Sequence, residues 1–169
     1  PHKNHLVLID AFNQLAERHP EVRLVLTGGA GRAEAQVIDA VANSPHTDRI
    51  DRLGRVPENE LVERMAAATV LAFPSSYEGF GLPVLEAMAM GVPVVAGAGT
   101  PAADLVNDPA LLADPNDVAA WAQALDRLVS DPDSCYQAAQ KGLARAQAHR
   151  WEYSAAQLEQ AWRLVLAKN

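Results

Sequence analysis

The 169 residues, 49% hydrophobic and 21% charged, are typical of one globular domain and exclude a chain that is disordered by composition. The formal net charge of −7 argues against a nucleic-acid partner, which needs a basic face, but it allows an anion held by local backbone amides. The single Cys135 allows no internal disulfide and fits a reducing cytoplasm, and no apolar run is long enough to span a membrane.

Helical and extended patterns alternate along the chain. Asn4 is the expected N-cap of a first helix with apolar residues from Leu6 to Ala16, which Pro20 ends. The later helices are expected at 33–42, 57–68, from Pro83 to a left-handed cap at Gly91, at 101–106, from 116 or 117 to 129, and near 133–149 and 154–167. Strands are expected at 22–27, 50–54, 70–73, 92–96 and 111–112.

This alternation predicts a single α/β domain over residues 1–169, with a parallel sheet flanked by helices. In such sheets ligands bind beyond the carboxyl ends of the strands, so the loops after Thr27, Gly54, Phe73 and Ala96 should share one edge. The run Gly28–Gly31 lacks the full dinucleotide fingerprint and is interpreted as a turn. The three tryptophans on the C-terminal helices are most simply packing residues (Trp121, Trp151 and Trp162).

The stretch 74–96 contains the most informative pattern, a strand end, a glycine loop, a short helix and a new strand. Gly79 and Gly81 allow a sharp turn, and Pro83 suits the first turn of a helix. The helix N-terminus then offers unpaired N–H groups that suit a phosphate. Leu85, Met88 and Ala89 are expected to form the inward face of this helix.

Two carboxylates flank this loop. Glu78 precedes it and Glu86 lies in the following helix, where each would repel a phosphate but could accept hydrogen bonds from sugar or ribose hydroxyls. Each residue alone has a structural explanation, since an acid in a first helical turn is favourable without any ligand. The combination favours a nucleotide-sugar site.

The run Glu78-Gly-Phe-Gly-Leu-Pro-Val-Leu-Glu86 resembles the E-x7-E motif of the retaining glycosyltransferases of family 4, which have the GT-B fold. Pro74-Ser75 before it, and Ala87-Met88-Ala89 and Gly91-Val92-Pro93 after it, match that family too. The resemblance covers nearly the whole chain. It implies a Rossmann-like domain, the C-terminal, donor-binding half of such an enzyme.

The family pattern implies roles for individual residues. Glu78 would hold a donor sugar hydroxyl, Glu86 the ribose hydroxyls, and the amides of residues 79–82 (Gly79, Phe80, Gly81 and Leu82) the diphosphate or the sugar. Lys3, in the expected Lys-Asn pair, would neutralise the leaving diphosphate, although alone it could be a solvated surface lysine. Arg55 and Val56 would lie at the nucleobase, or be a surface charge and a core residue.

The resemblance also implies a GDP- or UDP-sugar donor, front-face transfer of a hexose with retention, and no metal or other cofactor. Alanine at Ala102 replaces the glutamate usual in the family, and the family's preceding strand and N-terminal acceptor half are expected to be absent. A glycan or lipid-linked acceptor would bind through that N-terminal half. The resemblance implies a role in polysaccharide assembly in the cytoplasm, and it leaves peripheral membrane association open. The alternatives are a nucleotide-sugar-binding module that does not transfer, an epimerase-like module, and a flavodoxin-like or response-regulator-like signalling domain, which would leave the E-x7-E match unexplained.

Overall fold

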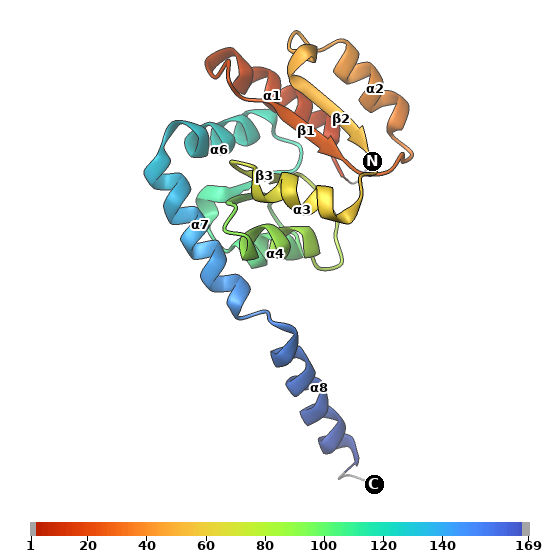
Figure 1. Cartoon of the computed structure of the whole chain (residues 1–169), viewed down its shortest axis with the longest axis vertical. Helices are drawn as coiled ribbons and strands as arrows, with labels where there is room; N and C mark the ends of the chain where they lie inside the picture. Colours follow the sequence, from red (N-terminus) through yellow and green to blue (C-terminus); the bar gives the residue numbers. More distant parts are fainter. Residues whose placement is uncertain (1–2, 167–169) are drawn as a thin grey trace.

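The computed structural model describes residues 3–166, in which short parallel strands lie among helices (Figure 1). The strands are β1 (Leu24–Thr27), β2 (Ile50–Gly54), β3 (Leu71–Phe73), β4 (Val94–Gly97) and β5 (Leu112–Ala113). The α-helices are α1 (His5–Arg18), α2 (Glu34–Ala42), α3 (Glu58–Ala66), α4 (Leu82–Ala89), α5 (Pro101–Val106), α6 (Val118–Ser130), α7 (Pro132–Gln147) and α8 (Trp151–Leu166). Two 3₁₀ turns that the sequence did not predict are η1 (Thr47–Arg49) and η2 (Pro109–Leu111).

The strands form two separate sheets. β1 pairs with β2, and β4 lies between β3 and β5, with every pairing parallel. The α/β class and the parallel direction are therefore confirmed. The single sheet expected from the sequence is instead divided, because no ladder of hydrogen bonds joins β1 to β3 within residues 3–166.

Helix packing explains where the core lies. α1 packs against α6 and α2, while α4 packs against α7 and α5. Trp121 of α6 is fully buried, and its indole N–H donates to the Asp114 carbonyl at 3.0 Å. The packing role predicted for Trp121 is confirmed.

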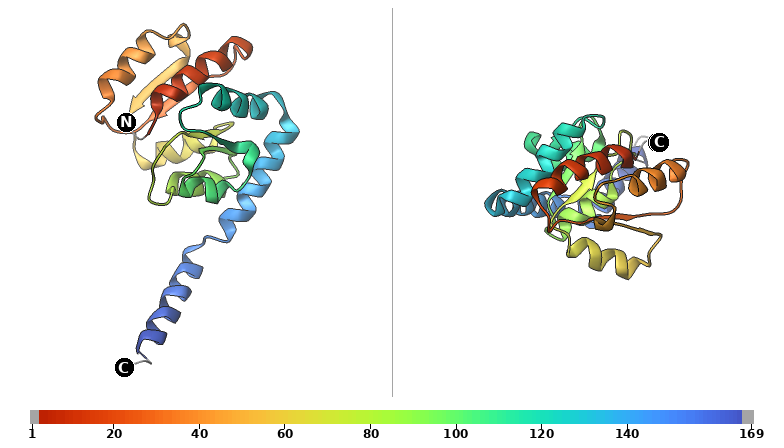
Figure 2. Two further views of the ribbon diagram at one scale, coloured as in Figure 1. Left: turned by 180° about the vertical axis from the view of Figure 1, so that it is seen from behind. Right: turned by 90° about the horizontal axis from the view of Figure 1, so that it is seen from above.

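α8 continues beyond α7 and projects away from the rest of the chain in Figure 1 and in the left view of Figure 2. None of its residues is buried, and Trp151 and Trp162 are 80% and 62% exposed. The packing role predicted for these two tryptophans is therefore wrong within residues 3–166. Trp151 and Trp162 do lie on a helix, as their spacing indicated, but little of the described chain covers the side of α8 on which they lie. No helix in this part of the chain has the length and apolar character needed to cross a membrane.

Two local predictions need correction. The buried residues of α4 are Val84, Ala87 and Met88, so Met88 was predicted correctly, whereas Leu85 is half-buried and Ala89 is exposed. β4 begins at Val94 rather than Val92, because the Val92 amide donates to the Ala87 carbonyl and so belongs to the end of α4. The left-handed conformation predicted for Gly91 is confirmed by its φ of 74°.

Candidate functional site

The glycine loop connects β3 to α4, as the sequence predicted. Gly81 has φ 99°, and a Cβ there would come within 3.1 Å of the Ala102 Cβ, so this close turn needs glycine. Within residues 3–166, no carbonyl accepts a hydrogen bond from the main-chain N–H groups of residues 79–82. These amides lie at the positive end of the α4 dipole, which makes the loop a cradle for an anion.

Lys3 and Glu78 meet beside this cradle, although 75 residues separate them. The Lys3 ammonium pairs with the Glu78 carboxylate and lies 5.3 Å from the centroid of the Phe73 ring. The Glu78 side chain is 17% exposed and that of Lys3 is 46% exposed, so water and ligands can still reach the cation. The structure thus brings together the two residues to which the family resemblance assigned diphosphate and sugar contacts.

A tight contact supports the cradle from beneath. A Cβ on Gly97, at the end of β4, would come within 2.4 Å of the Ser75 carbonyl oxygen. Ser75 itself is buried. Thr100 donates to the Gly97 carbonyl at 2.8 Å and also caps α5 by accepting from the Ala103 amide. The loops after β3 and β4 are therefore held directly against one another.

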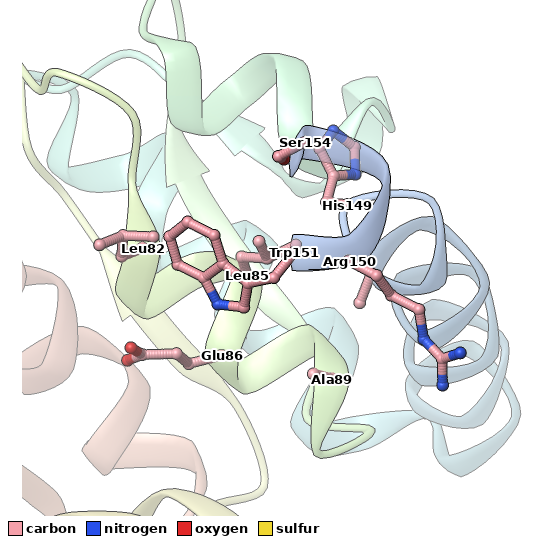
Figure 3. Close-up of a pocket in the computed structure, with 9 residues that line it drawn as sticks. Leu82, Leu85, Glu86, Ala89, His149, Arg150, Trp151 and Ser154 are labelled. Carbon is pink, nitrogen blue, oxygen red and sulfur yellow. The ribbon is translucent and has the colours of Figure 1, made fainter. Parts of the chain in front are cut away.

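Glu86 is exposed on α4, and Figure 3 shows its carboxylate pointing away from the start of α8. It forms one border of a hollow of about 340 Å³ between α4 and the corner that joins α7 to α8. In Figure 3 the Trp151 indole reaches toward Leu82 and Leu85 across this hollow. The Phe80 ring also approaches the ring of His149, with centroids 6.4 Å apart.

Arg55 and Val56 directly follow β2, in the sheet formed by β1 and β2. Arg55 is exposed and Val56 is half-buried, so Val56 is not a core residue. The Gly28 amide donates to the Gly54 carbonyl at 2.8 Å, which joins the loops after β1 and β2. No hydrogen bond or ion pair in the described chain links Arg55 or Val56 to residues 79–82.

Sequence reasoning missed several supports of the site. Asn4 was identified only as a cap, and Phe73 only as a strand residue, yet both contribute to the surroundings of Lys3. Burial, followed by the nearby Lys3 cation, lowers the pKa of His5 and so favours the neutral form of its ring. The Lys3-Asn4 pair is the one sequence pattern that could have drawn attention to Asn4.

No group of three or more potential metal ligands occurs in the described part of the chain.

The family model described as "Glycosyl transferases group 1" matches residues 1–145. The chain belongs to this family. Among curated relatives, this group 1 glycosyltransferase chain is 37% identical over 166 residues to the O-antigen chain mannosyltransferase B of Escherichia coli, covering 98% of the chain and 44% of the relative. It is 38% identical to the D-inositol 3-phosphate glycosyltransferase of Corynebacterium urealyticum, covering 93% of the chain and 39% of the relative. The chain therefore spans less than half the length of these relatives.

Solved structures of GT-B glycosyltransferases have the same fold as this group 1 chain. Sucrose-phosphate synthase from Thermosynechococcus elongatus superposes with a TM-score of 0.86 at 30% identity, covering 99% of the chain and 43% of that protein. Anabaena HepE, solved in complex with UDP and glucose, gives 0.82 at 26% identity, covering 98% and 45%.

Proposed function

We propose that this chain is the donor-binding part of a retaining glycosyltransferase that transfers a hexose from a nucleotide diphosphate sugar. The acceptor is a glycan or a lipid-linked molecule that binds to the rest of the protein, and the protein works in the cytoplasm. The observation that supports this most directly is the row of amides at residues 79–82, which no carbonyl of residues 3–166 accepts, with Lys3 and Glu78 paired beside it.

The proposed roles follow from charge and hydrogen bonding. The amides at the start of α4 bind the diphosphate, since each can donate to a phosphate oxygen. Lys3 adds a mobile positive charge that stabilises the leaving diphosphate. Glu78 accepts a hydrogen bond from a hydroxyl of the donor sugar, and Glu86 accepts from the ribose. Arg55 and Val56 lie at the base.

In the proposed reaction, the bond between the sugar C1 and the diphosphate oxygen breaks, and its electron pair stays on the diphosphate. The acceptor hydroxyl oxygen bonds to C1 on the same face, and its proton passes to the departing phosphate oxygen. The protein supplies electrostatic stabilisation rather than a nucleophile, so no metal is needed when Lys3 and the helix amides carry the positive charge.

Calorimetric titration of the protein with GDP, UDP and ADP tests the donor site. We expect saturable binding of one of these nucleotides, unchanged by EDTA. Removing Glu86 with Glu86→Ala should weaken binding about 5–50-fold, since one or two hydrogen bonds to a charged group are lost.

Glu63→Ala is the matched control, because Glu63 is an exposed glutamate on α3, outside the proposed site. Equal losses in both variants would contradict the assignment of Glu86. Absence of binding for all three nucleotides, in a protein shown to be folded, would contradict the donor-site proposal. A nucleotide sugar that binds without any transfer to added glycans would favour a binding module instead.

A further inference from the structure

The residue that follows Lys3 has an unusual backbone conformation and a distant partner. Asn4 lies immediately before α1 with φ 47° and ψ 37°, in the left-handed region. Its side chain does not cap α1 and instead donates from Nδ2 to the Pro115 carbonyl at 3.1 Å, 111 residues further along the chain. One residue thus fixes both the direction of the chain at Lys3 and its attachment to the loop after β5.

The acceptor of this hydrogen bond belongs to a well-fixed loop. The Asp114 carbonyl accepts the indole N–H of the buried Trp121, and the Asp114 carboxylate accepts the Asn116 amide at 2.8 Å. The Ala113 carbonyl, at the end of β5, accepts the Ala98 amide at 2.8 Å. Pro115 is therefore flanked by residues that are tied to the core, and Asn4 connects Lys3 to that core.

We propose that Asn4 is a positioning residue that holds Lys3 beside the anion cradle. The proposal rests on the donor-binding function proposed above. A lysine carries its charge on four flexible methylenes, so its position depends on where the backbone starts and on what the stem touches. Phe73 and Glu78 guide the side chain of Lys3, whereas Asn4 fixes its backbone.

Asparagine combines two properties that substitutions can separate. It tolerates the left-handed region better than most residues, and its amide can donate a hydrogen bond. Glycine keeps the conformation without the donor, and alanine loses both. Asn4→Gly therefore tests the hydrogen bond to Pro115, and Asn4→Ala adds the effect of the backbone.

The experiment is a double-mutant cycle read by calorimetry with whichever of GDP, UDP and ADP binds. We expect Asn4→Gly to weaken nucleotide binding about 3–10-fold and Asn4→Ala more, since a net hydrogen bond corresponds to about a fivefold change. In a Lys3→Ala background, Asn4→Gly should change the affinity less than about twofold. The salt dependence of the affinity should fall in Asn4→Gly as it does in Lys3→Ala, because both displace the same charge.

Thermal unfolding of each variant provides the control for folding. If Asn4→Ala unfolds the protein, the affinities of Asn4→Gly, with and without Lys3→Ala, are sufficient to test the proposal. Equal losses of affinity with and without Lys3, or no loss in Asn4→Gly, would overturn the positioning role. If Lys3→Ala binds as tightly as the wild type while Glu86→Ala binds weakly, the roles of Lys3 and Asn4 both fail and the donor site stands. If no nucleotide binds the folded wild type, the donor site fails as well.

Discussion

The two sheets of this chain differ in how completely their strands are covered. β4 is buried along its whole length and Val95 has no exposed surface, whereas Val25 in β1 is 44% exposed. The anion cradle is attached to the covered sheet, through the loop between β3 and α4. Arg55 and Val56 follow β2 in the less covered sheet. The part of the site proposed to hold diphosphate therefore rests on the better-packed half of the chain.

The largest expected effect is from Trp121→Ala on the covered side. The substitution removes a fully buried indole and its hydrogen bond to the Asp114 carbonyl, so it should lower the free energy of unfolding by about 3–5 kcal/mol. Urea unfolding followed by circular dichroism measures this loss. Trp162→Ala in the exposed α8 is the control and should change stability by less than about 0.5 kcal/mol. Equal losses in the two variants would mean that α8 is as well packed as α6.

The next largest effect is expected from Gly97→Ala. Its Cβ would come within 2.4 Å of a backbone oxygen that cannot rotate away, and such overpacking costs about 1–3 kcal/mol. Gly31→Ala, in the loop after β1, is the matched control because, apart from Gly31 and its two chain neighbours, no atom of the described chain lies within 4 Å of a Cβ built there. It should change the midpoint of urea unfolding little. A Gly97→Ala variant as stable as the wild type would contradict the close contact between the loops after β3 and β4.

A matched pair of valines tests the comparison of the sheets directly. Val95→Ala should destabilise by about 2 kcal/mol, because two buried methyl groups are lost and a cavity remains. Val25→Ala makes the same chemical change on a half-exposed side chain and should cost less than about 1 kcal/mol. Both values come from urea unfolding, and similar values would remove the proposed difference between the sheets.

The smallest effect concerns acid stability on the covered side. The hydrogen bond from Lys141 of α7, with one from the Ala110 amide, holds the pKa of Asp108 below its usual value. A carboxyl whose pKa is lowered by folding stabilises the native state above its unfolded pKa, and this contribution is lost as the pH falls through the folded value. Lys141→Ala should therefore lower stability by less than about 1 kcal/mol at pH 7 and by nothing measurable near pH 2.

Urea midpoints at pH 7, 4 and 2 measure this difference. Arg163→Ala, which breaks a more exposed ion pair with Glu159 in α8, is the control and should have no effect at any pH. A loss in Lys141→Ala that persists unchanged at pH 2 would show that the lysine acts through packing rather than through charge.

The sequence predicted most elements because their patterns are local. Pro20, Asp117 and Gly91 act on their own neighbours, and the helices end or begin near them in the structure. The pairing of strands is not local, so the division into two sheets was not predicted. The exposure of Trp151 and Trp162 was missed for a related reason, since helical spacing identifies an apolar face but not what covers it.

In the candidate site, too, the local features were predicted from the sequence and the long-range contacts were not. The glycine loop and the start of α4 were readable because turn and helix preferences act over a few residues. The pairing of Lys3 with Glu78 and the tether from Asn4 to Pro115 span 75 and 111 residues, and no local pattern encodes such distances. The family resemblance suggested that Lys3 and Glu78 both serve the donor, but it gave no partner for Asn4.

The distribution of tryptophan has a consequence for spectroscopy. Of the three indoles in the sequence, Trp121 is enclosed in the core, and the other two are mostly in water on α8. Exposed indoles emit at longer wavelength and are quenched by iodide, whereas an enclosed one is shielded. Intrinsic fluorescence will therefore report mainly on the surroundings of α8. A blue shift with loss of iodide quenching, at unchanged circular dichroism, would be the optical signature of α8 becoming covered.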